Sequence, residues 1–260
     1  MLIGSEMKIL EVITHYYSRD NLEYLFQNRK LHHPNTFFII VDNCGTFKPP
    51  KDFNGEVIQG WQQNNPGYTT SDYHYTGTHE GLDYIWMNKY FWHYDYVLAS
   101  QQDMFFKQGI DKLPPHDFLQ TTPNIGEHNP AGDFWTSDIW WGCSMDKFKM
   151  ACIFLHENDH SEKDKLFRAF GDESVPIDML GTILNLKYNY NFNHKEGWIN
   201  LQDFYYGDEL LCINMCESYP FTHNDYGEGV SDASAEFNPH HKDNTRWADR
   251  YDEVVKLWVE

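Results

Sequence analysis

The residues best suited to chemistry stand directly after two apolar stretches of the chain. They are Asp42 and Asn43 after residues 36–41 (TFFIIV), and Gln101, Gln102 and Asp103 after residues 94–100 (YDYVLAS). Polar residues at strand ends in an open α/β sheet lie in the crevice where ligands bind. A carboxylate is also a preferred ligand of hard divalent cations. The two groups therefore predict a place where a nucleotide is read and a metal is held.

Strands and helices alternate along the first half of the sequence, as would be needed to bring those groups together. Apolar and β-branched residues dominate residues 7–14 and 36–41, which predicts two buried strands. Residues 21–31 follow several capping residues and predict a helix. Further elements are expected at residues 56–59 (strand), 78–92 (helix), 94–100 (strand) and 104–106 (strand). Such an alternation predicts βαβ units on a mostly parallel sheet.

The second half of the chain is less regular. Four prolines interrupt residues 113–134, which we expect to form loops. Helices are predicted at residues 146–155, 161–170, 175–186 and 245–260, and a strand at residues 210–215. We expect one domain over residues 1–220 and a C-terminal extension, residues 221–260, that packs on the same domain.

The order of these segments resembles that of GT-A glycosyltransferases, in particular the family-2-like nucleotide-sugar transferases. Residues 8–14 and 21–31 resemble the opening strand and helix, and FIIVDN (38–43) resembles the second strand. The other similar segments are THEGL (78–82) near the diphosphate, YVLASQQDMF (96–105) with the Asp-x-Asp metal motif, WGCSM (141–145) with Phe148 on the acceptor side, and Gly171-Asp172-Glu173 as the acidic motif.

This resemblance implies a GT-A fold: a Rossmann-like, mostly parallel central sheet flanked by helices, with an irregular acceptor-side half and a C-terminal helical extension. It implies an enzyme that moves a sugar from a nucleoside-diphosphate sugar to a hydroxyl of a glycan or other acceptor. The implied residues are Thr14, Asp42, Asn43, His79, Gln101 and Gln102 for the nucleotide, Asp103 and His223 for the metal, Asp172, Glu173 and Asp178 for catalysis, and Trp140, Trp141 and Gly142 for the acceptor.

The implied reaction is a single displacement. A carboxylate removes the proton of the acceptor hydroxyl, the hydroxyl attacks the anomeric carbon, and the nucleoside diphosphate leaves. Bound Mn²⁺ or Mg²⁺ would stabilise the charge on the leaving group. This course inverts the anomeric configuration, and a retaining course stays open.

Two motifs depart from the family pattern. The sequence has Gln101-Gln102-Asp103 at the metal motif, so one carboxylate remains and a metal-independent enzyme is an alternative. After Asp172 and Glu173, Ser174, Val175, Pro176 and Ile177 precede the next acid, Asp178, and the identity of the base among these three acids is left open.

Each candidate also has a purely structural interpretation. Asp42 could be a turn residue that ends a strand, and Asp103 a solvated acid. The acids at 172–173 could cap the following helix, and His223 could be an ordinary exposed or structural histidine. Trp135, Trp140 and Trp141 could belong to the core. The adjacent pairs His32-His33 and His240-His241 are not expected to form metal sites, because neighbouring side chains point apart.

Composition excludes several classes of partner. The 260 residues include 39 acidic and 20 basic side chains, a formal charge of −19, which argues against nucleic acid or an anionic membrane surface as a partner. No apolar run is long enough for a transmembrane segment. The N-terminal residues lack a signal-peptide layout, and five cysteines without a Cys-x-x-Cys pair favour reduced thiols. We therefore expect a cytoplasmic protein.

The acidic charge also bears on the proposed donor. A diphosphate needs local counter-charge, and the candidate motifs hold no dense cluster of Lys or Arg, so metal dependence is the favoured alternative. Two other functions compete with a glycosyltransferase. One is a catalytically inactive nucleotide- or sugar-binding module, which Gln101 and Gln102 support. The other is a metal-dependent hydrolase built on His223, Asp225 and His240, for which no recognised His-containing metal motif is present.

Overall fold

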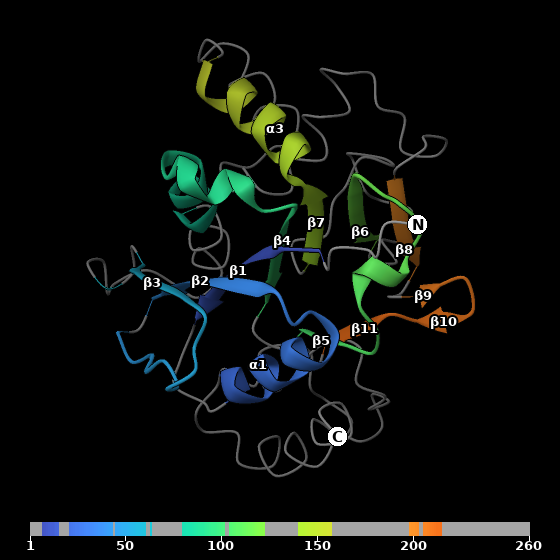
Figure 1. Cartoon of the computed structure of the whole chain (residues 1–260), viewed down its shortest axis with the longest axis horizontal. Coiled ribbons are helices and arrows are strands. Elements are labelled where there is room, and N and C mark those ends of the chain that lie inside the picture. The colour runs from blue at the N-terminus through green and yellow to red at the C-terminus, as the bar shows by residue number, and fades with distance from the viewer. Residues whose placement is uncertain are drawn as a thin grey trace, which may run out of the picture.

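The computed structural model describes residues 7–15, 21–43, 45–60, 63, 80–101, 104–122, 140–157, 198–202 and 205–214 (Figure 1). The strands within this part of the chain are β1 Ile9–His15, β2 Thr36–Asp42, β3 Gly55–Gln59, β4 Tyr96–Gln101, β5 Met104–Phe106, β6 Phe118–Thr122, β7 Trp140–Ser144, β8 Trp198–Gln202, β9 Tyr205–Tyr206, β10 Glu209–Leu210 and β11 Cys212–Asn214. The helices are α1 Asn21–His32, residues 80–87, α3 Met145–Glu157, and the 3₁₀ turns η2 Lys89–His93 and η3 Ile110–Lys112.

One large sheet dominates the described part of the chain, in the order β10-β9-β8-β6-β7-β4-β1-β2-β3. Strands β3, β2, β1 and β4 are mutually parallel. Strand β7 runs antiparallel to both β4 and β6, so β6 and its parallel neighbour β8 again follow the direction of β4. The prediction of a mostly parallel sheet in a mixed α/β fold is confirmed.

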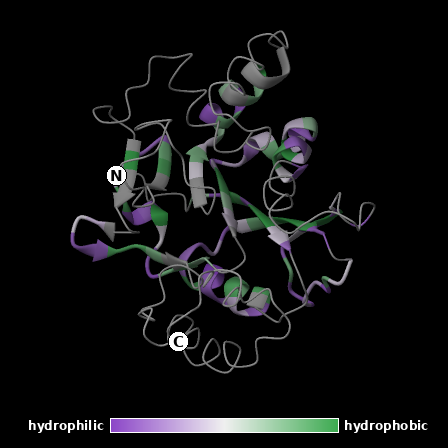
Figure 2. Cartoon of the chain, turned by 180° about the vertical axis from the view of Figure 1, so that it is seen from behind, coloured by the Kyte–Doolittle hydropathy of each residue, from purple (hydrophilic) through white to green (hydrophobic). Residues whose placement is uncertain are grey.

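Helices cover both faces of the central strands, because successive side chains of a strand point to opposite faces. Leu10 and Val12 of β1 pack in one cluster with residues of the 80–87 helix and α3. Ile13, on the other face, packs with Leu22 and Leu25 of α1. Figure 1 shows α1 and α3 on opposite sides of the sheet, and Figure 2 shows hydrophobic residues concentrated in the central strands.

Helix α1 buries polar side chains on the face that it turns to the sheet. Asn28 is fully buried, and its amide forms two hydrogen bonds with the backbone of Phe106 in β5: Nδ2 donates to the carbonyl and Oδ1 accepts from the amide N–H, each at 2.8 Å. The side chain thus extends the pairing of β5 as another strand would. This contact fixes β5, which also pairs with β11, against α1.

A buried histidine follows α1 and makes the stability of the fold sensitive to pH. His33 Nε2 accepts a hydrogen bond from the Ile110 N–H at 2.9 Å, which requires a neutral ring. Burial, and secondly Arg29 and His32, lower the pKa of His33 well below its ordinary value of 6.5. Below about pH 6.5 the unfolded chain therefore binds a proton that the folded chain does not, so stability falls as pH falls.

We expect the free energy of unfolding to drop by up to ~1.4 kcal/mol for each pH unit below ~6.5 on account of His33. Urea titrations at pH 7.5, 6.5 and 5.5 measure this slope. The variant His33→Gln keeps an acceptor for Ile110. Its free energy of unfolding should fall by up to ~1.4 kcal/mol less per pH unit than that of the parent protein, because one titrating group is removed. An unchanged slope in His33→Gln would contradict the assignment.

Several elements differ from the sequence-based expectation. The region expected to be loops, 113–134, contains β6, which is held by pairing with β7 and β8. The helix expected over residues 78–92 is interrupted at Asn88, after which the chain continues as η2. Residues 210–215 were expected as one strand, but the chain passes from β10 in the large sheet to β11 in the small one. Residues 161–170, 175–186 and 221–260 lie outside the described residues.

Gly81, in the 80–87 helix, packs closely against β1 and β2 of the sheet. A Cβ at this position would lie 2.4 Å from Val12 Cγ1 and 3.1 Å from Val41 Cγ2. Alanine is the better helix former, but here the added methyl would overpack the core. We expect Gly81→Ala to lower the free energy of unfolding by ~1–3 kcal/mol in urea titrations. A gain in stability would contradict the close packing.

Candidate functional site

The carboxyl ends of β1, β2 and β4 meet at one edge of the large sheet. The strand order reverses at β1, because β2 lies next to it on one side and β4 lies next to it on the other. Thr14 of β1 pairs in register with Val41 of β2 and with Gln101 of β4. One residue further along, His15 pairs with Asp42. Ligands of open α/β sheets bind at such a switch point, outside the carboxyl ends of the strands.

A buried histidine–carboxylate pair marks this edge. His15 Nδ1 and Asp42 Oδ1 are 2.9 Å apart, and the two residues are only 2% and 5% exposed. Because a carboxylate accepts hydrogen bonds, Nδ1 carries the proton and donates. That arrangement fixes the orientation of the imidazole and leaves Nε2 as the ring atom available for other contacts, as in sites where a carboxylate orients a histidine.

Asp42 also organises the turn that follows β2. Its Oδ1 accepts from the Gly45 N–H and its Oδ2 from the Phe47 N–H, both at 3.0 Å. Gly45 has a φ of +68°, a left-handed conformation that glycine adopts without strain. Phe47 in turn packs on the His15 ring, with 5.5 Å between ring centroids. One carboxylate therefore holds both the histidine and the backbone of the turn.

Asn43 is a buried polar residue at this edge, and its side-chain amide forms no hydrogen bond with the described residues. It is 2% exposed, and neither Nδ2 nor Oδ1 has a hydrogen-bond partner among the described residues. The amide lies against Gly60, where an added Cβ would come within 2.0 Å of Oδ1. A buried polar group without a partner costs ~1–3 kcal/mol. An amide with an adjacent free donor and acceptor suits a ligand that presents the complementary pair.

Replacing the organising carboxylate tests this geometry. In Asp42→Asn, the side-chain NH₂ replaces one oxygen and faces a donor, because His15, Gly45 and Phe47 all donate to this side chain. We expect a loss of ~1–3 kcal/mol in the free energy of unfolding. Asp52→Asn is the matched control: Asp52 is an exposed partner of Lys30, and exposed pairs contribute at most ~1 kcal/mol. Equal effects of the two changes in urea titrations would contradict the role of Asp42.

The structure brings part of the predicted site together. Thr14, Asp42, Asn43 and Gln101 lie at the same edge. Trp140 begins β7 and pairs with Ser100 near the end of β4, so its backbone is at this edge as well. Nucleotide binding by these residues, and acceptor binding by Trp140, stay predictions.

The segment WGCSM, which the resemblance places on the acceptor side, belongs mostly to strand β7. Trp141 and Gly142 lie within β7, opposite Ala99 and Leu98 of β4. Gly142 is buried, and a Cβ there would lie 2.4 Å from Tyr96 Cε1, so this glycine permits close packing of the Tyr96 ring. The strand forms because β7 is paired on both sides, by β4 and by β6.

The remaining predicted site residues lie outside the described part of the chain. They are His79, Gln102, Asp103, Asp172, Glu173, Asp178 and His223. Within the described ranges, no group of three or more His, Cys, Asp or Glu side chains could hold a metal ion. Also within those ranges, no helix has the length and apolar character to cross a membrane.

His15 is the site residue that sequence reasoning missed. The first strand was expected to end at Thr14, whereas β1 continues to His15. A signal was present, since His15 is a polar residue at the end of an apolar run, the same criterion that selected Asp42. Extending the strand by one residue would have placed His15 beside Asp42 in the parallel register.

Comparison with known proteins adds no relative: no protein-family model matches the chain, and no curated protein matches its sequence. The resemblance to GT-A glycosyltransferases therefore stays a prediction that rests on the residues quoted above.

Proposed function

We propose that the chain is a GT-A-like glycosyltransferase that binds a nucleotide-sugar donor at the carboxyl ends of β1, β2 and β4. The observation that carries this proposal is the unpaired, buried amide of Asn43 beside the His15–Asp42 pair. A mostly parallel sheet with helices on both faces agrees with the fold that the resemblance implies. Residues at the donor-reading positions of the resemblance, Asp42 and Asn43, are among those at this edge.

In this proposal Asn43 reads the nucleobase. The imide edge of a pyrimidine offers an N–H next to a carbonyl, which complements the Oδ1 acceptor and Nδ2 donor of an amide. Asp42 acts by fixing the turn over residues 42–47 and the His15 ring, since its carboxylate already accepts from three groups of the protein. His15 Nε2 is the atom of the pair that we assign to the phosphate side of the donor.

His15 also bears on the problem of holding an anion in a chain of charge −19. When protonated, the ring is paired with Asp42 through Nδ1 and can donate from Nε2 to a phosphate oxygen. A charge-assisted hydrogen bond of this kind is about twice as strong as a neutral one. Bound Mn²⁺ or Mg²⁺, with Asp103 and His223 as proposed ligands, would supply further counter-charge to the diphosphate.

The chemical step remains as the resemblance implies it. An acceptor hydroxyl gives its proton to one of Asp172, Glu173 or Asp178, and its oxygen forms the new bond to the anomeric carbon. The bond from that carbon to the diphosphate oxygen breaks, and the nucleoside diphosphate leaves with the electron pair. Trp140, at the start of β7, is the residue that the resemblance assigns to the acceptor sugar.

The experiment is a transfer and hydrolysis assay with UDP-, GDP- and TDP-sugars in the presence of Mn²⁺, read together with the melting temperature. We expect one donor to raise the melting temperature and to be turned over, and Asp103→Ala to abolish turnover. A donor that binds without hydrolysis or transfer would instead support an inactive binding module. If no nucleotide shifts the melting temperature and Asp103→Ala changes nothing, the proposal fails.

A further inference from the structure

A cavity of about 330 Å³ lies at the opposite edge of the sheet from Asn43. Its walls come from the start of β1, the end of α1 and the segment after β5. The lining residues are Met7, Ile9, Leu31, His32, His33, Pro34, Lys107, Gln108, Gly109, Asp111 and Lys112. Ile9 begins β1 and His15 ends it, so six strand steps of ~3.3 Å place the two sites roughly 20 Å apart.

The lining of the cavity combines apolar and cationic residues. Met7, Ile9, Leu31 and Pro34 form the apolar part. Lys107 and Lys112 contribute two ammonium groups and Asp111 one carboxylate, and the lining residue Gln108 donates from Nε2 to Glu209 Oε2 at 3.5 Å. Lys112 Nζ is 3.9 Å from Asp111 Oδ2, and both side chains of this pair are exposed, so the pair adds little to stability. The cavity therefore places two lysine donors next to apolar groups.

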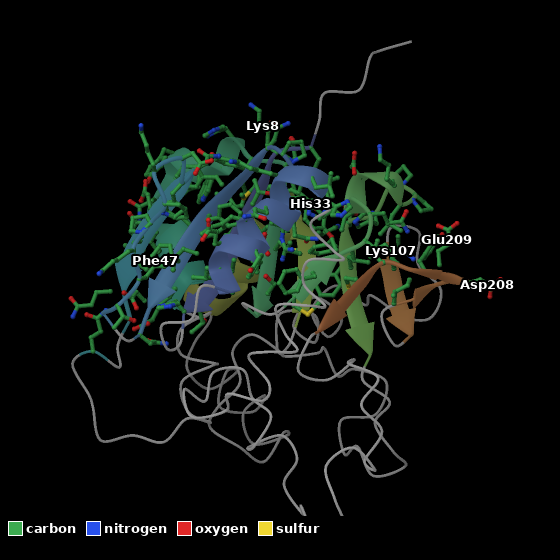
Figure 3. The ribbon with its side chains drawn as sticks, turned by 90° about the horizontal axis from the view of Figure 1, so that it is seen from below. Lys8, His33, Phe47, Lys107, Asp208 and Glu209 are labelled. Carbon is green, nitrogen blue, oxygen red and sulfur yellow. The ribbon has the colours of Figure 1, made fainter. Side chains whose placement is uncertain are left out.

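The segment that carries the lysines is held in place by defined contacts. The Lys107 N–H donates to the Leu211 carbonyl at 2.8 Å. The Ile110 N–H donates to His33 Nε2 at 2.9 Å. Gly109 comes so close to the end of α1 that an added Cβ would lie 2.6 Å from the His32 carbonyl oxygen. The cavity is therefore part of the fold and not a gap between loose loops. Figure 3 labels His33 and Lys107.

The hydrogen-bonding groups favour an acceptor as ligand. Because His33 Nε2 accepts from Ile110, the neutral ring carries its proton on Nδ1. That Nδ1 is buried and has no hydrogen-bond partner among the described residues. An ammonium group also donates and never accepts. The lysines disfavour a cation and can donate to an oxyanion, and the apolar lining residues suit a small hydrocarbon group.

We propose that this cavity binds a small organic oxyanion, an apolar group that carries one phosphate or carboxylate. The volume falls at the lower end of the range for small-molecule sites, which combine apolar walls with a few polar groups. Lys107 and Lys112 hold the oxyanion, and the start of β1 with Leu31 and Pro34 covers the apolar part. This site is separate from the proposed donor site and does not depend on it.

Isothermal titration with phenyl phosphate and with benzoate tests the proposal on the full chain. Inorganic phosphate serves as the head group alone, and benzyl alcohol as the neutral apolar part. We expect at least one of the two aromatic anions to bind saturably and more tightly than either fragment. The double variant Lys107→Met/Lys112→Met should weaken that binding by about tenfold for each lysine, because charge-assisted hydrogen bonds are the strong class.

Two controls locate the effect. Lys89→Met/Lys149→Met makes the same change in net charge beside Trp92 and should leave the affinity within about twofold, because salt screens distant charges. Asn43→Leu should also leave it unchanged. The proposal is overturned if neither anion binds, if benzyl alcohol binds as tightly, if Lys107→Met/Lys112→Met binds as the parent does, or if Asn43→Leu removes the binding.

Discussion

Arg29→Met lowers the free energy of unfolding by ~3–5 kcal/mol, the cost of leaving one partner of a buried ion pair uncompensated. Arg29 and Glu11 are 1% and 0% exposed. The guanidinium donates to Glu11 from Nε at 2.8 Å and from Nη2 at 2.7 Å. In the variant, Glu11 keeps the 2.5 Å hydrogen bond from Ser100 Oγ but loses its counter-charge.

The effect extends beyond the ion pair because Arg29 has further partners. Its Nη1 donates to Asn28 Oδ1 at 2.8 Å and to the Met104 carbonyl at 3.0 Å. Its Cζ lies 4.4 Å from the centroid of the Phe106 ring. The side chain thereby connects α1 with β1 and β5, and Glu11 extends the network to Ser100 of β4, so the loss of Arg29 loosens strands that lead to the candidate site.

Urea titrations of a small set of variants check the pair. Lys30→Met is the matched control, because the neighbouring Lys30 pairs with Asp52 in the open and should cost at most ~1 kcal/mol. Glu11→Leu/Arg29→Met removes both charges and should be clearly more stable than Arg29→Met alone. If Arg29→Met does not fold, Arg29→Lys, which keeps the charge, provides the measurement. A cost below ~1 kcal/mol for Arg29→Met would contradict a stabilising buried pair.

The second large effect is on binding. Asn43→Leu should weaken nucleotide affinity by about tenfold to a hundredfold, because the ligand's base edge would face an apolar side chain and leave its own polar atoms unpaired. In the free protein the same change removes two buried atoms without hydrogen-bond partners in the described region. Stability should therefore stay the same or rise, a combination typical of residues kept for function.

Nucleotide affinity is measured by titration with UDP, GDP and TDP in the presence of Mn²⁺. The free energy of unfolding is measured by urea titration of the same preparations. Asn54→Leu is the control, since Asn54 Nδ2 donates to the Thr36 carbonyl at 2.8 Å and its loss should reduce stability and spare affinity. Should Asn43→Leu instead destabilise the free protein and bind nucleotide normally, the amide would have a structural role.

The central strands could be predicted because their buried residues are mostly apolar or β-branched. Continuous β-branched and apolar runs gave β1, β2 and β4, and the alternation with helices gave the parallel arrangement. Strand β6 could not be predicted in this way. Its Gln120, Thr121 and Thr122 have no apolar pattern, and the strand is held by β7 and β8, which are distant in the sequence. The burial of the Glu11–Arg29 ion pair could not be predicted either, because charged side chains are usually exposed.

Asp42 and Asn43 could be found from the sequence because they end a clear strand. Their different roles could not. Only the structure distinguishes the carboxylate, which accepts from His15, Gly45 and Phe47, from the amide, which accepts from none of the described residues. His15 was missed because the expected strand was one residue too short, and register depends on pairing with β2.

A crystal structure of the protein soaked with UDP and Mn²⁺ tests the central claim most directly. We predict the uracil at the end of β2, paired with the Asn43 amide, and the diphosphate beside the carboxyl ends of β1 and β4, within reach of His15 Nε2. A nucleotide bound at another edge of the sheet, or an Asn43 amide that keeps no contact with it, would contradict the account.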